Sequence, residues 1–321
     1  MLGFKDKKII FKDREIKMSI IEQSEFLKLS YYGDTTNYKL MICCPHAYEG
    51  ASFLEKFPQI QKHTQLSDAN FKRYLAIEQD FATEELGELI ASICAEKFNL
   101  PTLVIQPLFP RSIIDAGRFY PHNLRNILDY ENLPELKQKL LDIHSDYITT
   151  LKSLVNTLND HNGIALDLHT MSPHSPLSSP ETVYSEALKE TPGSLSEYIA
   201  AYKTSHINGY RREVELFTGE PHRQIYAYQP FIDAVHKNFT ELGIKVEFDT
   251  PYVVAPHLVG CYFLQNTKTV CVDIPKDLIS TKITTDKDYS LANLTIDTQK
   301  LDTVAHVLAS AAAIAIEGDR Q

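Results

Sequence analysis

Residues 38–50 read YKLMICCPHAYEG, and this stretch is the most informative about the fold. Its first seven residues form a nearly continuous apolar run, which is typical of a strand buried on both faces of a sheet. Pro45 ends the run, and the polar residues His46 and Glu49 follow directly. We therefore predict a buried strand whose carboxyl end carries polar side chains.

Two later segments have the same form. The run LVIQPLFP at 103–110 leads into Arg111, and the run IALDL at 164–168 leads into His169. In open α/β sheets the carboxyl ends of parallel strands meet at one edge, and ligands bind in the crevice there. We therefore expect the three polar clusters to come together in one site.

Amphipathic helices separate these strands and define the fold class. The helical spacing of apolar residues is clearest at 83–98 and at 134–158, which begins with proline. Further predictions are short peripheral strands at 8–12 and 27–32, strands at 244–248 and 269–274, and helices at 197–205, 230–242 and 297–316. Alternating strands and helices predict the α/β class, with a central mixed, largely parallel sheet flanked by helices. We expect one domain over residues 1–321, with a loop-rich insertion at about 172–230 where Pro and Ser are frequent.

The composition limits the classes of partner. The 321 residues include 32 Lys and Arg and 42 Asp and Glu, a formal net charge of −10. This acidic balance argues against nucleic acid and anionic membranes as partners, and the apolar run 304–316 is too short to span a bilayer. The N-terminus has no apolar signal segment, and the five cysteines show no CxxC spacing, which indicates reduced thiols in a cytoplasmic protein. We expect a small-molecule partner, and the sequence predicts no oligomeric state.

The polar clusters contain a pattern typical of catalytic zinc. Such sites often use two histidines and one carboxylate and leave one position open for water. His46 and Glu49 stand three apart, and His169 at another strand end would complete the set. Asp167, two residues before His169 and on the same face of the strand, is suited to hold a ring N–H. The alternative is a surface histidine beside a solvated glutamate.

The arginines near this pattern suggest a carboxylate-bearing substrate. Arg111 and Arg118 stand seven apart with Asp115 between them, and guanidinium groups bind carboxylates through two parallel hydrogen bonds. One of them would also polarise the scissile carbonyl group. The alternative is a structural pair between arginine and Asp115. Arg211, in the segment Tyr210-Arg211-Arg212, is a further candidate for contact with a substrate carboxylate.

These blocks resemble a known family. PHAYEG at 45–50, EQDFATEEL at 78–86, RSIIDAGRFYP at 111–121 and LDLHTM at 166–171 occur in the order seen in N-formylglutamate amidohydrolases, and the similarity continues through 251–265 and VCVDIPKDL at 270–278. The resemblance implies a fold like that of zinc exopeptidases and aspartoacylases, one Zn²⁺ per chain, and hydrolysis of an amide next to a carboxylate. It places the metal ligands at His46, Glu49 and His169, and the substrate-contacting arginines at Arg111 and Arg118.

Three departures from the family pattern affect this assignment. The family usually has Asn where this chain has Gly117, which affects an orienting hydrogen bond to the substrate. Many members lack Glu at the position of Glu49 and have an aspartate that matches Asp80, so Asp80 is the reserve metal ligand. The last strand of the family often carries a glutamate as general base, where this chain has Asp273. Asp273 is therefore either the base or a member of a salt bridge with one of the arginines.

The predicted function is a zinc-dependent amidohydrolase acting on an N-formyl or N-acyl amino acid such as N-formylglutamate. A zinc carboxypeptidase-like peptidase is the alternative enzyme, because a C-terminal peptide bond presents the same chemical groups. A binding protein that keeps the fold without catalysis is the alternative from another class. Metal content and turnover of N-formylglutamate against short peptides separate the three.

Overall fold

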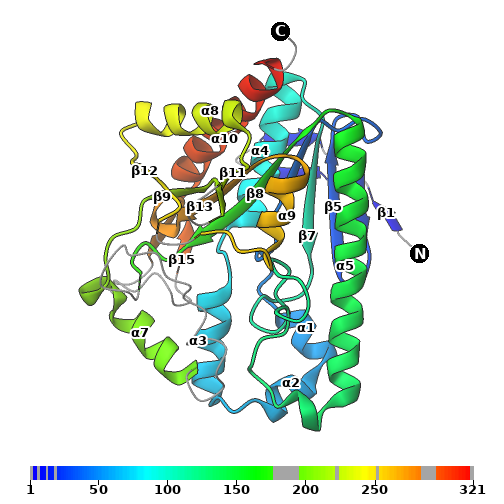
Figure 1. Cartoon of the computed structure of the whole chain (residues 1–321), viewed down its shortest axis with the longest axis vertical. Helices are drawn as coiled ribbons and strands as arrows, with labels where there is room; N and C mark the ends of the chain where they lie inside the picture. The colour runs from blue at the N-terminus through cyan, green and yellow to red at the C-terminus, as the bar shows by residue number, and fades with distance from the viewer. Residues whose placement is uncertain are drawn as a thin grey trace.

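A mixed sheet of nine strands runs through the described part of the chain (Figure 1). The computed structural model describes residues 3–5, 8–11, 14–17, 20–175, 195–220, 224–250, 253–282 and 294–318. Across the sheet, the strands are β1 (Gly3–Lys5), β4 (Ile20–Gln23), β5 (Leu27–Tyr32), β7 (Thr102–Pro107), β6 (Leu40–Cys43), β8 (Ile164–Met171), β13 (Lys268–Pro275), β9 (Val214–Phe217) and β12 (Val246–Phe248). The central strands β7, β6, β8 and β13 are parallel, and antiparallel strands flank them. The predicted α/β class and mixed sheet are confirmed.

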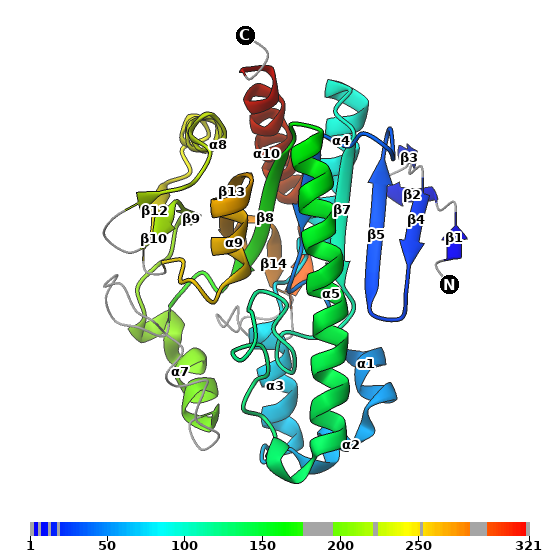
Figure 2. The ribbon, with the colours of Figure 1, turned by 45° about the vertical axis from the view of Figure 1, so that its right-hand side comes forward.

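The central strands are mostly apolar, as expected for strands covered on both faces of the sheet. Leu40 and Ile42 of β6 belong to the core beneath α4 (Thr83–Phe98), α8 (Gln229–Glu241) and α10 (Thr298–Gly318). Met41 and Cys43 belong to the opposite core, which contains α5 (Pro134–Asp160). Figure 2 shows α5 on one side of the strands and α10 on the other.

The predicted elements are largely confirmed. The helix at 83–98 has the predicted bounds, and the helix that begins at Pro134 ends at Asp160. The strand predicted at 164–168 continues as β8 to Met171, so His169 lies within the strand rather than after it. The strand at 27–32 was expected to be peripheral, but β5 lies inside the sheet between β4 and β7.

Several elements were not predicted. They are α1 (Ala51–Lys56), α2 (Pro58–His63), α3 (Asp68–Glu78) and α9 (Val259–Asn266), together with β3 (Arg14–Lys17), which pairs with the predicted strand β2 (Lys8–Phe11), and the small ladder of β14 (Ser280–Lys282) with β15 (Leu294–Ile296). Of these, α1 to α3 lie near the carboxyl ends of the central strands, where the site is expected (Figure 1).

The segment predicted as an insertion contributes regular structure. It contains α7 (Leu195–Asn208), which packs against α3, the main-sheet strand β9, and the pair β10 (Gly219–Glu220) with β11 (Gln224–Ile225). Residues 176–194 and 221–223 of the segment lie outside the described residues, and this includes most of the Pro- and Ser-rich stretch.

Helix α10 is long and apolar enough to cross a membrane by length and composition alone, but 61% of its most apolar window is buried inside the protein. It packs against α4 and α8, as the core helix of a globular protein does. The five cysteines are all free and buried, which agrees with their interpretation as reduced thiols.

Candidate metal centre

Three elements far apart in the sequence bring His46, Asp80 and His169 together. His46 lies in the turn that follows β6, Asp80 lies in the turn between α3 and α4, and His169 lies on β8. The backbone N–H of Asp80 donates to the carbonyl oxygen of His46 at 3.0 Å, which fixes one turn against the other. One ligand atom from each of the three side chains lies within 4.8 Å of the others.

Two further carboxylates orient the imidazole rings. His46 Nε2 lies 2.8 Å from Asp115 Oδ1, and His169 Nε2 lies 3.3 Å from Asp167 Oδ2. A carboxylate accepts a hydrogen bond from a protonated nitrogen, so in a neutral ring each Nδ1 atom carries the lone pair. The predicted position of Asp167 beside His169 is therefore found in the structure.

The Nδ1 atoms of both histidines face Asp80. His46 Nδ1 lies 3.3 Å and His169 Nδ1 lies 2.9 Å from Asp80 Oδ2. His46 Nδ1 is buried without a hydrogen-bond partner among the described residues. Lone pairs that face one another in a buried site repel unless a proton or a cation lies between them. Two imidazole nitrogens and one carboxylate oxygen are ligands that zinc prefers. The residues present thus fit a metal ion.

The charges of the group support the same conclusion. Burial alone would raise the pKa of the Asp80 carboxyl, but His46 and His169 hold it below its ordinary value. Burial alone would lower the pKa of His169, but Asp167 and Asp80 raise it well above the ordinary value. Asp80 is therefore ionised at neutral pH, as a metal ligand must be, and without a metal His169 carries the proton that a bound ion would displace.

The predicted ligand Glu49 is not part of this group. Its side chain is exposed, and it does not line the cavity described below. Side chains three apart converge on a helix, but residues 47–50 are not helical, and α1 begins only at Ala51. The choice of Glu49 is therefore corrected, and the reserve ligand Asp80 lies beside the two histidines instead.

Asp115 connects this group to the arginines. Its Oδ2 lies 3.0 Å from Arg118 Nε, 2.5 Å from Arg125 Nη2 and 3.7 Å from Arg111 Nε. Burial alone would raise the pKa of Asp115, but Arg125 and His46 hold it well below its ordinary value. The alternative interpretation of Asp115 as a structural partner of arginine is thus the one that the structure supports.

The two predicted arginines differ in accessibility. Both line the cavity, but the Arg111 side chain is 23% exposed and the Arg118 side chain only 3%. Arg111 makes longer contacts of 3.6 Å with Glu78 Oε2 and Asp80 Oδ1. Its guanidinium is therefore the more accessible of the two for a ligand.

Gly117 allows the backbone to approach the metal group. A Cβ atom at this position would lie 2.9 Å from His46 Nε2 and 3.2 Å from Asp115 Oδ1. Its backbone N–H donates to Asp115 Oδ1 at 2.9 Å. The glycine at this position, where the resemblance suggested Asn, thus coincides with close packing against the candidate ligand His46.

Asp273 on β13 lines the same cavity as the arginines. It is next to His169 in the register of β13 and β8. Its Oδ1 is buried without a hydrogen-bond partner among the described residues, and its Oδ2 lies 3.6 Å from Arg212 Nη2. Burial raises the pKa of Asp273, and Arg212 opposes this increase only in part. Arg212 is held mainly by Glu215, through hydrogen bonds of 3.1 and 3.0 Å.

The predicted contact residue Arg211 points elsewhere. Its guanidinium contacts Asp277 and the carbonyl oxygen of Pro173, and it does not line the cavity. The next residue, Arg212, lines it instead, because successive side chains of an extended segment point to opposite sides. The prediction that Arg211 contacts the substrate is therefore corrected, because the residue of this segment that lines the cavity is its neighbour Arg212.

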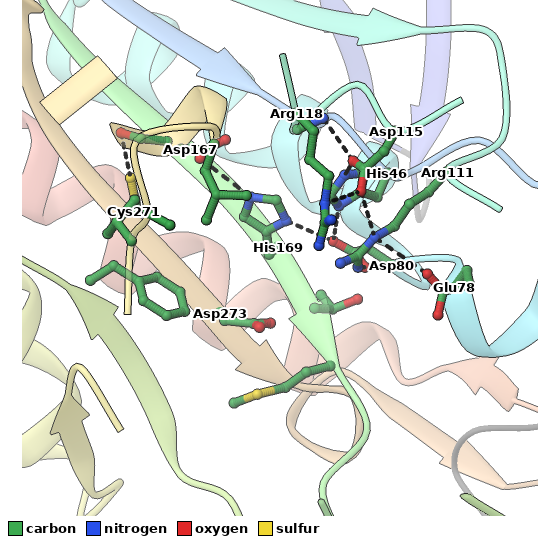
Figure 3. A pocket seen from close by; sticks show the side chains of 18 of the residues that line it. His46, Glu78, Asp80, Arg111, Asp115, Arg118, Asp167, His169, Cys271 and Asp273 are labelled. Atoms are coloured by element: carbon green, nitrogen blue, oxygen red, sulfur yellow. Dashed lines mark hydrogen bonds and ion pairs between the residues drawn. The ribbon is translucent and has the colours of Figure 1, made fainter. Parts of the chain in front are cut away.

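The candidate metal ligands, Asp115, Asp167, Asp273 and the three arginines Arg111, Arg118 and Arg212 line one cavity of about 200 Å³. Figure 3 shows Arg111, Arg118 and Asp115 to the right of His169, and Asp273 below it. Sequence analysis missed the lining residues Glu78, Tyr198 and Tyr202. The spacing of the two tyrosines, four apart on α7, was a signal that they share one face of the helix.

Comparison with known proteins supports the fold. No family model matches the sequence, and neither does any curated protein. Among solved structures, N-formylglutamate amidohydrolase from Ralstonia eutropha is similar, with a TM-score of 0.56 and 13% identity over 91% of this chain and 98% of that protein. A gene product of Agrobacterium tumefaciens has a TM-score of 0.55 and 14% identity over 91% of this chain and 96% of that one. The fold implied by the resemblance of the sequence blocks is therefore confirmed.

Proposed function

We propose that this protein is a zinc-dependent amidohydrolase that cleaves an amide next to a carboxylate. The substrate class is an N-formyl or N-acyl amino acid, of which N-formylglutamate is one example. The observation that carries this proposal is the convergence of His46, Asp80 and His169 in a cavity that Arg111 and Asp273 also line. The fold shared with a protein named N-formylglutamate amidohydrolase supports it.

The metal would be held by His46 Nδ1, His169 Nδ1 and a carboxylate oxygen of Asp80. When bound, zinc polarises a carbonyl group and lowers the pKa of water toward about 7. Asp115 and Asp167 keep both rings in the orientation and tautomer that this binding needs. A cavity of about 200 Å³ favours a small substrate.

The remaining residues divide the other tasks. Arg111 holds the carboxylate of the substrate, since it is more accessible than Arg118, the other arginine beside the candidate metal ligands. Asp273 Oδ1 accepts a proton from the attacking water and returns it to the leaving amine, because it lines the cavity and is not engaged by a hydrogen bond. Arg118 holds Asp115 in place and, through it, His46.

Metal analysis tests the ligand assignment. Protein purified without added metal should contain close to one zinc per chain, and Asp80→Ala should lose most of it. Glu49→Ala is the matched control and should keep its zinc, since Glu49 is exposed and outside the cavity. Full zinc content in Asp80→Ala, or a loss in Glu49→Ala, would contradict the assignment.

Turnover tests the reaction. The zinc-loaded protein should release the amine from N-formyl amino acids and should act poorly on short peptides with a free C-terminus. Preferred cleavage of peptides would favour the carboxypeptidase-like alternative. Tight ligand binding without turnover of either substrate class would favour a non-catalytic binding protein.

A further inference from the structure

The cations that face the cavity are unequally available to a substrate. Among the described lining residues, Arg111 and Arg118 lie beside the metal group, and Arg212 lies near Asp273. Both Nε and an Nη atom of Arg212 donate to the buried Glu215. The Arg212 side chain is also only 3% exposed, against 23% for Arg111, so a substrate carboxylate reaches Arg111 more easily.

A wall of two aromatic rings and one aliphatic side chain, with the Glu78 carboxylate beside it, stands next to Arg111. Glu78 Oε2 lies 3.6 Å from Arg111 Nε, and Glu78 Oε1 accepts a hydrogen bond of 2.6 Å from the hydroxyl of Tyr198. The Tyr198 and Tyr202 rings contact each other, with centroids 4.9 Å apart. With Ile77 of α3, these two rings of α7 form the wall of the cavity, which we call the α3–α7 wall.

A substrate carboxylate bound at Arg111 brings the adjacent side chain within reach of this wall. The carboxylate and the side chain of an amino acid share the same Cα atom, so the side chain lies within a few bonds of the group that Arg111 holds. A second carboxylate there would lose its hydration, with Glu78 as the nearest charged side chain of the wall. An apolar side chain would instead gain free energy by leaving water.

We infer that the preferred substrates carry one carboxylate and an apolar side chain, as in N-acyl derivatives of leucine or phenylalanine. The α3–α7 wall binds that side chain, and Tyr202 is its specificity-determining residue. This inference rests on the proposed function and narrows its substrate class. It makes N-formylglutamate, with two carboxylates, a poor substrate of this protein.

The test compares N-formylleucine, N-formylphenylalanine and N-formylglutamate with the zinc-loaded protein. We expect kcat/KM for the two apolar substrates to exceed that for N-formylglutamate by about tenfold or more, since a side-chain pocket discriminates on this scale. Equal or faster turnover of N-formylglutamate would overturn the inference and leave the proposed function in place.

Variants at Tyr202 assign the preference to the wall. Tyr202→Ala should lower kcat/KM for N-formylphenylalanine about tenfold relative to N-formylglycine, which has no side chain. Tyr202→Phe keeps the ring and should keep the ratio. Equal losses on both substrates in Tyr202→Ala would show that the ring does not contact the side chain.

Binding of the products separates the two proposals. If none of the N-formyl amino acids is hydrolysed, the proposed function fails, and calorimetry with free leucine and free glutamate still tests the wall. Tighter binding of leucine would support the inference, and tighter binding of glutamate or equal binding would refute it.

Discussion

Asp115→Asn removes one negative charge from the point where Arg118, Arg125 and His46 meet. The asparagine keeps an oxygen for His46 Nε2 and for the backbone N–H of Gly117. Its amide nitrogen, however, would replace the oxygen that lies 3.0 Å from Arg118 Nε and 2.5 Å from Arg125 Nη2. Two buried guanidinium groups would then face a donor in place of an ionised acceptor.

The expected cost follows from the burial of this cluster. Breaking a buried ion pair by removing one partner costs about 3–5 kcal/mol of unfolding free energy. For 321 residues, an unfolding entropy of about 2.1 cal/mol/K per residue gives about 0.7 kcal/mol/K, so the melting temperature should fall by about 4–7 °C. Thermal melting with a chelator present measures this without a contribution from bound metal. Asp142→Asn, on the exposed surface of α5, is the matched control and should change the free energy by less than about 0.5 kcal/mol.

The loss of stability in Asp115→Asn should depend on pH, because only the ionised form of Asp115 pairs with the arginines. The folded pKa of Asp115 lies below the unfolded value of about 4, so its stabilisation is complete above that pH and is lost as the pH falls below it. The difference in stability between wild type and Asp115→Asn should thus be full at pH 7 and should shrink below about pH 4. A difference that is absent at pH 7, or that stays constant down to pH 2, would refute the role of Asp115 as an ionised partner.

Three further substitutions test the site. Asp273→Asn should lower turnover by about 10²–10⁴-fold with zinc content unchanged, and an active variant would exclude Asp273 as the base. Gly117→Ala would place a Cβ atom 2.9 Å from His46 Nε2, so zinc affinity, measured by competition with a chelator, should fall about 10–100-fold. Gly318→Ala, which meets nothing within 4 Å, is its control and should bind zinc normally. Arg111→Lys should weaken binding of carboxylate substrates by about 1–3 kcal/mol, and an equal loss on substrates with an amidated carboxylate would indicate a structural role.

The sequence by itself determined the elements whose patterns are local. The helix at 83–98 has the predicted bounds because its apolar residues repeat at the helical spacing along its whole length. The buried strand β6 is predictable because both of its faces are apolar, and this places His46 just after it; the same pattern predicts β8, although that strand continues past His169 to Met171. These assignments need no knowledge of which segments meet in space.

Only the tertiary structure decided which carboxylate accompanies the histidines and which arginine enters the cavity. Glu49 is close to His46 in sequence, but the chain between them is not helical, whereas Asp80 is brought in by the backbone hydrogen bond between two distant turns. Arg211 and Arg212 are the same residue type at adjacent positions, so the sequence does not distinguish them. The direction in which each side chain points depends on how the segment before β9 packs. The spacing of two residues along the chain predicts that their side chains are close only where the backbone conformation is known. Long-range packing therefore determines which of two candidate residues of similar chemistry lies in the site.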